Sequence, residues 1–317
     1  MKKVLLFSSV FAVTFLTALL LFALPASAKS GRWGELTWTF YSGRGELVIS
    51  GNGDMDDWAS QESDTWHTYA SSIKSVKIEE GVTRIGKGAF YGCINLTQIT
   101  IPSSVTSIGD AAFYSCSSLT EVHIPESVTE IAAKAFQDCH SLESMILPDS
   151  VTSIGNYAFG NCASMTSIMI PNSVTKIEMG AFLGCSSLTS ITIPSSVKSL
   201  SYRLFGNCTA LTEITLPASI RTINAQAVEG CTNLTVVKYW GTQAQWAEII
   251  VGNGNEKILS ALCIMGETTE NDPPLGEPEK ADDGKEDGCG SVVSGSFGMI
   301  ALVALAGGLI LSKKRKI

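Results

Sequence analysis

Apolar and polar positions alternate along this chain in a pattern that returns every 23 residues between about residues 73 and 239. In one unit, Leu119, Val122 and Ile124 are separated by polar residues, and around Glu121–Ile124 the period is two. That alternation predicts a short strand, which Pro125 ends because proline has no N–H for a sheet ladder. The remainder of each unit is expected to turn back over the core in irregular or short helical structure. A repeat of this length predicts a solenoid, whose coils bury their apolar faces against one another.

The spacing within the unit is that of a leucine-rich repeat. Leu119, Val122 and Ile124 take the first, fourth and sixth places of the pattern L-x-x-L-x-L-x-x-N/C. Ser127 takes the ninth place, so the sequence predicts a ladder of hydroxyls where amides are commoner. Eight strand positions follow between residues 73 and 239. Stacked in parallel at about 4.8 Å, they predict an α/β solenoid, mostly β, on the order of 35 Å long.

Two flanking modules are expected to cover the ends of the solenoid at residues 73–239. In the N-terminal module, 29–72, Leu36–Phe40 and Glu46–Ser50 flank a Gly-rich turn, which predicts a β-hairpin. Trp58 and Trp66 follow and would supply apolar area to close the first coil. In the C-terminal module, 240–266, the stretch from Gln243 to Ile250 predicts a short helix with Trp246 and Ile249 on one face.

The unit I-P-x-S-V-T-x-I-G-x-x-A-F-x-x-C-x-x-L-T resembles that of the BspA-like leucine-rich repeat proteins over about residues 73 to 239. Leu36-Thr-Trp38 and Gly241-Thr-Gln-Ala-Gln-Trp246 are similar to the flanking modules of that family. The resemblance implies a secreted or surface-displayed protein. Many members of the family are thought to act as adhesins toward host matrix proteins or other cells.

The two termini carry targeting signals. Lys2 and Lys3, an apolar run and Ala26-Ser27-Ala28 predict a signal peptide over residues 1–28. Residues 292–312 are apolar and uncharged and precede a basic tail, 313–317, which predicts a membrane span or a processed sorting helix with a cytoplasmic tail. Before it, Gly288, Cys289, Gly290 and Ser291 resemble the start of a tripartite sorting or anchoring tail. Cys289 is also a candidate for processing or lipid attachment.

The net charge of −8 hides an asymmetry along the chain. The signal peptide contributes +2 and the tail +4, which leaves −14 for residues 29–312. Residues 267–291 hold nine acids against two lysines, together with three prolines, and are expected to form an extended acidic stalk. An exported surface this acidic argues against nucleic acid as a partner.

Seven cysteines from Cys93 to Cys231 share the 23-residue spacing. Metal binding needs converging ligands, and catalysis needs one activated thiolate with a base, so one thiol per coil fits neither. Stacked coils would place the cysteines within disulfide reach, and export makes disulfides an open alternative. Seven cysteines in one column, with all thiols pointing the same way, cannot all pair into disulfides. We therefore interpret these cysteines as small buried apolar side chains. Cys263 is expected to lie in the C-terminal cap core.

No catalytic or cofactor-binding motif stands out in the chain. His67, His123 and His140 have no metal-ligand or catalytic spacing, and no P-loop, Rossmann fingerprint or nucleophile elbow is present. Asp54 and Asp56 follow a glycine turn but lack the rest of a calcium loop. The sequence therefore predicts a protein that is not an enzyme and that needs no metal or cofactor.

The outward positions of the strands are the candidate binding residues. With Val122 and Ile124 turned inward, alternation turns Glu121 and His123 outward. Most equivalents in other coils are small hydroxyl residues such as Thr192, but Ile146 and Met169 are apolar neighbours in the column of His123. Exposed apolar residues set together can mark a binding patch, although an incidental placement is the alternative.

These observations predict a non-catalytic surface protein that adheres to an extracellular protein or glycan through its solenoid face and is held at the membrane by its C-terminal helix. A structural spacer of the cell envelope is the alternative, since a Ser/Thr-rich sheet without features suits that role. An accessory domain of an enzyme ranks last, because no catalytic module is attached.

Overall fold

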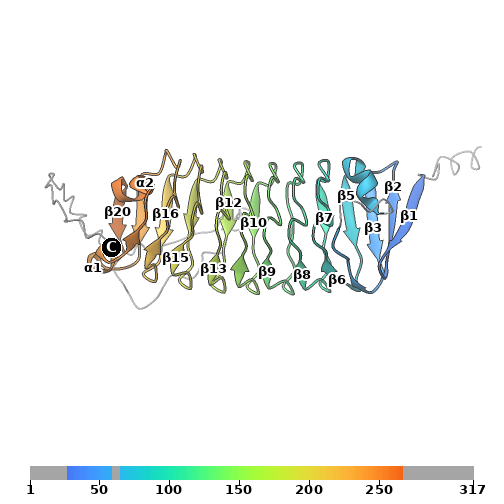
Figure 1. Cartoon of the computed structure of the whole chain (residues 1–317), viewed down its shortest axis with the longest axis horizontal. Coiled ribbons are helices and arrows are strands. Elements are labelled where there is room, and N and C mark those ends of the chain that lie inside the picture. The colour runs from blue at the N-terminus through green and yellow to red at the C-terminus, as the bar shows by residue number, and fades with distance from the viewer. Residues whose placement is uncertain (1–26, 59–64, 267–317) are drawn as a thin grey trace, which may run out of the picture. The chain divides into compact units, whose positions relative to one another are not determined.

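The computed structural model describes residues 27–58 and 65–266, and these form a stack of similar coils (Figure 1). The coils contribute to two columns of short parallel strands, which we call the front column and the second column. The buried apolar residues form one continuous core between the columns, from Trp33 to Ile258. A mostly β solenoid with coils of 23 residues, as predicted, is therefore confirmed.

The front column begins and ends in the caps. The antiparallel strands β1 (Ala28–Trp33), β2 (Leu36–Tyr41) and β3 (Glu46–Ser50) open it, and β3 pairs in parallel with the first coil. The following strands are β5 (Ser75–Ile78), β7 (Gln98–Thr100), β10 (Ser144–Ile146), β12 (Ser167–Met169), β14 (Ser190–Thr192), β16 (Glu213–Leu216), β18 (Val236–Tyr239) and β20 (Leu262–Met265).

The second column of strands was not predicted. Its strands are β4 (Gly53–Asp54), β6 (Val82–Ile85), β8 (Ser107–Ile108), β9 (Glu130–Ile131), β11 (Ser153–Ile154), β13 (Lys176–Ile177), β15 (Ser199–Leu200), β17 (Thr222–Ile223) and β19 (Ile250–Val251). Most are two-residue strands, and the expected helical returns between the columns are absent from the described coils, which use turns instead. A strand of two residues is too short to produce a detectable alternation of apolar and polar residues in the sequence.

The strand predicted at Glu121–Ile124 does not form. The front column is interrupted there, since β7 ends one sheet and β10 begins another. A three-residue strand that stops at proline makes few ladder bonds, so a small separation of neighbouring coils removes them. Ile99 and Val122 are 9% and 8% exposed, against 0% for Ile214 in a coil with complete pairing, which fits looser contact at this point.

The turns on the rear of the coils stack through aromatic rings and left-handed backbone. Successive phenylalanine rings lie 5.1 to 5.7 Å apart and within 15° of parallel. Each turn holds two residues with positive φ, four positions apart, as Lys134 and Asp138 do. Several of these positions hold glycine, asparagine or aspartate, which accept this conformation most readily. The stacked rings are Phe90, Phe113, Phe136, Phe159, Phe182 and Phe205.

Backbone hydrogen bonds between these rear turns all run in one direction. The N–H of Phe113 donates to the carbonyl of Ala135 at 2.8 Å, and the N–H of Phe136 donates to Ala158 at the same distance. Each turn therefore donates to the next coil and accepts from the previous one. As a consequence, the first turn needs outside donors and the last turn needs outside acceptors, because a buried polar group without a partner is costly.

The serine column forms the predicted ladder, with one difference. Each hydroxyl donates to a backbone carbonyl of the preceding coil, not to another hydroxyl. Ser150 Oγ lies 2.6 Å from the Val128 carbonyl, and Ser219 Oγ lies 2.7 Å from that of Val197. The hydroxyl column thus ties each coil to the one before it.

The N-terminal cap supplies the donors that the first turn needs. The indole N–H of Trp66 donates to the carbonyl of Ala89 at 2.8 Å, and the backbone N–H of Trp58 donates to Lys87 at 2.8 Å. Trp66 is fully buried and stacks on Phe90, while Trp33 packs edge-on against it at 4.5 Å. The predicted hairpin and the closing role of Trp66, which begins the 3₁₀ helix η1 (Trp66–Ser72), are confirmed.

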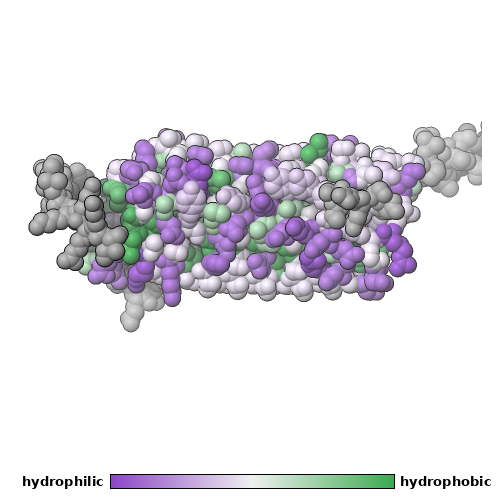
Figure 2. All heavy atoms as spheres, in the orientation of Figure 1, coloured by the Kyte–Doolittle hydropathy of each residue, from purple (hydrophilic) through white to green (hydrophobic). Residues whose placement is uncertain are grey.

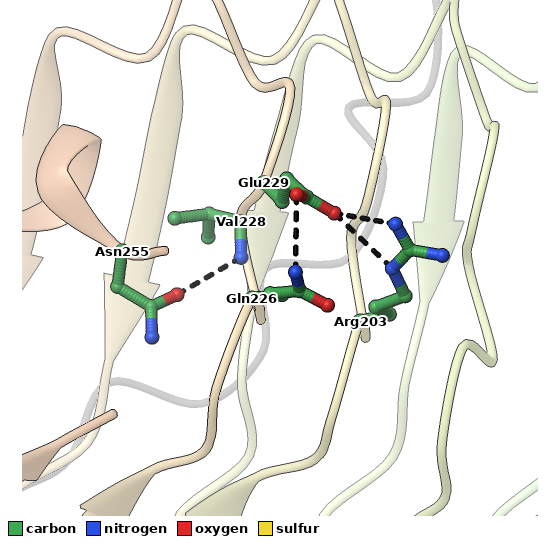
Figure 3. A network of polar contacts seen from close by, with 5 residues as sticks. All are labelled: Arg203, Gln226, Val228, Glu229 and Asn255. Atoms are coloured by element: carbon green, nitrogen blue, oxygen red, sulfur yellow. Dashed lines mark hydrogen bonds and ion pairs between the residues drawn. The ribbon is translucent and has the colours of Figure 1, made fainter. Parts of the chain in front are cut away.

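The C-terminal cap supplies the acceptors (Figure 3). Val228 N–H donates to Asn255 Oδ1 at 3.2 Å, and Gln226 N–H donates to the Asn253 carbonyl at 2.7 Å. Asn255 is 1% exposed, and its Nδ2 donates in turn to the carbonyls of Asn224 and Gly252. In the same view, Glu229 of the last turn accepts from Arg203 and Gln226, which joins two coils at left-handed positions.

Two short helices complete this cap. The predicted helix is α1 (Gln243–Ala247), with a capping box at Thr242 and with Trp246 packed on the core. Its expected last residue, Ile250, lies in β19 instead, because the chain joins the second column there. A second helix, α2 (Glu256–Ser260), follows Asn255 and buries Ile258.

The predicted signal peptide, stalk, span and tail fall on residues outside the described ranges, apart from Ser27 and Ala28. Ala28 is the first residue of β1. Within the described residues, no helix has the length and apolar character needed to cross a membrane. The boundaries proposed for these segments therefore remain predictions.

Candidate functional site

The front column presents its outward residues in two straight rows. Parallel pairing without register shift places Ser144 beside Ser167 and Ile146 beside Met169, and it places Thr192 beside Thr215. Each row therefore carries the same repeat position from coil to coil. A partner that lies along the coils would meet one residue from each row per coil.

A hollow of about 600 Å³ lies on this face over the first coils. Its floor is formed by Val76, Ile99 and Val122, which belong to the core, and polar side chains surround that floor. The hollow coincides with the first of two interruptions of the front column, the second of which lies between β12 and β14. The remaining lining residues are Glu46, Ser75, Lys77, Gln98, Thr100, Glu121, His123, Ser144 and Ile146.

Three of the five predicted binding residues line this hollow. Glu121 and His123 are exposed in the interrupted coil, and Ile146 is 64% exposed at the rim. Met169 lies next to Ile146 in the row but is only half-exposed and does not line the hollow. Thr192 is exposed on β14, farther along the column, and does not line it either.

The backbone of the interrupted coil adds to the polar character of the hollow. Among the described residues, the peptide groups of Glu121–Ile124 make no backbone hydrogen bond. Backbone groups are strong donors and acceptors that need partners. The hollow therefore offers unpaired main chain beside an imidazole, a carboxylate and an apolar side chain.

The charges around the hollow are mixed and largely paired. Lys77 lies 3.3 Å from Glu79, and Arg44 lies 3.5 Å from Glu46, in exposed ion pairs. Exposed pairs of this kind contribute little stability and leave both groups available to a ligand. The face has no block of one sign, so hydrogen-bonding groups and the exposed Ile146 are more prominent on it than net charge.

Sequence reasoning missed the contribution of the N-terminal cap and the first coil to this site. Glu46 comes from β3, and Ser75 and Lys77 come from β5. The alternation in Ser75-Val76-Lys77-Ile78 could have identified Ser75 and Lys77 as outward residues. Glu46 could not have been found in this way, because the pairing of β3 with β5 joins an antiparallel hairpin to a parallel column.

The cysteine column is chemically quiet. Its seven thiols are free in this structure and buried, which confirms the predicted burial of these side chains. Six of them donate to the carbonyl of a phenylalanine 26 residues earlier, at 3.0 to 3.2 Å. Burial raises the pKa of the Cys93 thiol to about 12, and it raises the pKa of the others as well. A protonated, buried thiol is a poor nucleophile and a poor metal ligand.

Cys263 and the acidic turn after Gly53 have structural roles in the two caps. Cys263 is partly buried against the core, as expected of a cap residue. Gly288, Cys289, Gly290 and Ser291 lie outside the described residues. Near the turn, Asp54 accepts from Thr83 at 2.6 Å, and Asp57 accepts from the Lys87 N–H at 2.8 Å and pairs with Arg84, so these carboxylates tie the cap to the first coil.

The repeated Ser, Phe and Cys ladders match a known family of repeats. The profile described as the BspA type leucine rich repeat region matches residues 64–169 and 152–247, with six copies. The chain belongs to this family. BspA-type repeats build repeat proteins that bind through their surfaces and are typically not catalytic. No curated protein was found to match the chain in sequence.

Solved structures of bacterial leucine-rich repeat proteins are similar to this chain. A leucine-rich repeat protein of T. pallidum, TpLRR, is 27% identical over 65% of this chain and 91% of its own, with a TM-score of 0.49. One from Bacteroides ovatus is 24% identical over 74% of this chain and 71% of its own, also with a TM-score of 0.49. A leucine-rich cell surface protein of Faecalibacterium prausnitzii is 22% identical over 71% and 98%, with a TM-score of 0.29.

Proposed function

We propose that this chain is a non-catalytic binding protein of the cell surface that holds an extracellular protein partner in the hollow of its front column. The observation that carries the proposal is the meeting of Glu121, His123 and Ile146 around that hollow. Polar groups around an apolar floor, with an exposed apolar side chain at the rim, suit a protein surface or an extended peptide. The predicted signal peptide supports export, and the predicted span supports retention at the membrane.

A protein partner is favoured over a glycan by the composition of the face. In the described strands of the front column, the outward positions from Glu46 to Ile264 hold no phenylalanine, tyrosine or tryptophan. Flat aromatic rings give a ligand a large apolar platform, and this face lacks them. Hydroxyl, amide and charged groups beside Ile146 instead resemble the mixed surface of a protein interface.

The test is binding of a fragment of residues 29–266, which contains the whole buried core, to matrix proteins and to cells. We expect saturable binding, and we expect Ile146→Asp to weaken it at least tenfold, because a carboxylate would replace the exposed apolar side chain. Ser190→Asp is the matched control: Ser190 is also exposed on the same face, but it lies outside the hollow.

Equal binding by both variants would refute the placement of the site in the hollow. Absence of saturable binding by the unaltered fragment would favour the alternative role as a spacer of the cell envelope. Thermal unfolding of the two variants should match that of the parent, because both side chains point into solvent.

A further inference from the structure

The C-terminal end of the coil column leaves apolar side chains in solvent. Leu262 and Ile264 of β20 are 65% and 45% exposed, and Ile250 of β19 is 70% exposed. Apolar surface gathers over the C-terminal coils in Figure 2. Clustered apolar residues at the end of a sheet are unusual on a monomer, and they mark an interaction surface more often than isolated ones do.

The main chain of β20 has an open edge. Leu262 N–H donates to Thr235 and Gly266 N–H donates to Tyr239, so these residues bond inward to the preceding coil. Because bonding alternates along a strand, Cys263 and Met265 turn their N–H and C=O groups outward. No strand within residues 27–58 and 65–266 pairs with that outer edge.

The opposite end of the column is protected against pairing. Its edge strand β1 carries the exposed Lys29 and Arg32, and the edge of the second column carries Asp54. Charged residues on edge strands oppose association with other chains. Neither β19 nor β20 contains a charged residue or a proline. Head-to-tail stacking would bring the charged Arg32, which lies beside Thr37 on the outward face, against the apolar outward face of β20, so the C-terminal edge is best matched by itself.

We propose that β20 pairs in antiparallel fashion with β20 of a second copy of this chain, which makes a tail-to-tail dimer. With Cys263 opposite Cys263 of the second copy, the outward N–H and C=O groups of both residues bond to each other. The same register sets Leu262 opposite Ile264 of the second copy, on one face, where the two side chains cover part of each other's apolar surface. Such an interface is isologous, as expected of a two-fold dimer, and it covers the outer edge of β20 in both copies.

Cys263 reports on this register directly. Residues opposite each other in a hydrogen-bonded antiparallel pair have Cα atoms about 5.5 Å apart, which a disulfide spans. The seven thiols of the coils are buried and donate inward, so they do not compete. In the full chain with Cys289→Ser, mild oxidation with copper phenanthroline should give a species of twice the chain mass on a non-reducing gel, and Cys263→Ser should abolish it.

Two further variants separate the proposed pairing from random collision. Leu262→Lys places a charge on the edge strand and should lower the yield of the cross-linked dimer at least tenfold. Ser190→Cys, made with Cys263→Ser and Cys289→Ser, places an exposed thiol on the same face in the middle of the column and should stay monomeric. Circular dichroism melting should show that each variant is folded.

Three results would overturn the proposal. If the Cys289→Ser chain stays monomeric after oxidation, β20 does not pair with a second copy. Its outer edge is then either covered by residues beyond 266 or left open. Equal cross-linking through Ser190→Cys would indicate random collision. An unchanged yield with Leu262→Lys would place Cys263 near its counterpart for a reason other than strand pairing. None of these results depends on the hollow, so the proposed function is tested separately.

Discussion

The two ends of the coil column solve the same problem with different side chains. The N-terminal end must provide donors to the first turn, and Trp66 does so with an indole N–H that also covers the aromatic stack. The C-terminal end must provide acceptors to the last turn, and Asn255 does so with a small amide that covers little apolar surface. One cap thus satisfies hydrogen bonds and buries apolar surface together. The other satisfies the hydrogen bonds and leaves Leu262 and Ile264 exposed.

This difference shows that capping a solenoid involves two separable tasks. A polar residue can complete the ladder of the turns while other side chains close the core, as Asn255 and Ile258 do, and a large aromatic residue can do both. The N-terminal edge is additionally charged, whereas the C-terminal edge is not. The C-terminal end is therefore suited to association, and the N-terminal end is suited to exposure.

The largest effect is expected at the N-terminal end. Trp66→Ala removes a fully buried indole that stacks on Phe90 and donates to Ala89. We expect a loss of about 3–5 kcal/mol in the free energy of unfolding, with the first coils becoming open to exchange. Hydrogen exchange measured by mass spectrometry would locate the change. Trp240→Ala, at a site 39% exposed, is the control and should cost much less; similar losses for both would contradict the closing role of Trp66.

The next effect is expected at the C-terminal end. Asn255→Leu leaves the Val228 N–H and the carbonyls of Asn224 and Gly252 without their partner. Each unsatisfied buried group costs about 1–3 kcal/mol, and partial rearrangement reduces the sum, so we expect a loss of about 2–3 kcal/mol. Denaturant unfolding is the measurement. Asn253→Ala serves as the control, since Asn253 acts through its backbone carbonyl; a loss there as large as that of Asn255→Leu would indicate general loop damage.

The smallest effect depends on pH and is confined to the N-terminal end. His67 stacks on Trp58 at 4.3 Å, and burial lowers the pKa of its imidazole from 6.5 to about 4. Between these values the unfolded chain binds a proton that the folded chain does not, so stability is lost as pH falls from 6.5 toward 4. Because the ring is partly exposed, we expect a loss on the order of 2 kcal/mol.

His67→Gln should remove most of this pH dependence while leaving stability at pH 8 nearly unchanged. His140→Gln is the control, because His140 is exposed and outside the aromatic cluster. Melting temperatures across pH 4 to 8 would decide the matter. Parallel pH profiles for the parent and His67→Gln would show that other groups control acid stability.

The coil period, the hydroxyl ladder, the buried thiols and the closing tryptophan could all be predicted from the sequence. Each depends on a residue type that recurs at one position of the repeat. Because the coils stack in register, that recurrence predicts a contact between neighbouring coils. His123, Glu121 and Ile146 could be placed outward for the same reason, since strand alternation depends on the local chain alone.

The joining of these residues into one hollow could not be predicted in this way. It depends on the loss of pairing at Glu121–Ile124, where coils that look alike in sequence separate slightly, and on Glu46, which reaches the site from an antiparallel hairpin. The same holds for the role of Asn255 and for the open edge at Leu262. The periodic residues of this protein specify how one coil stacks on the next. Tertiary contacts decide where the stacking loosens and how it ends. The reason is that the sequence of a single repeat does not determine the strength and geometry of packing between coils.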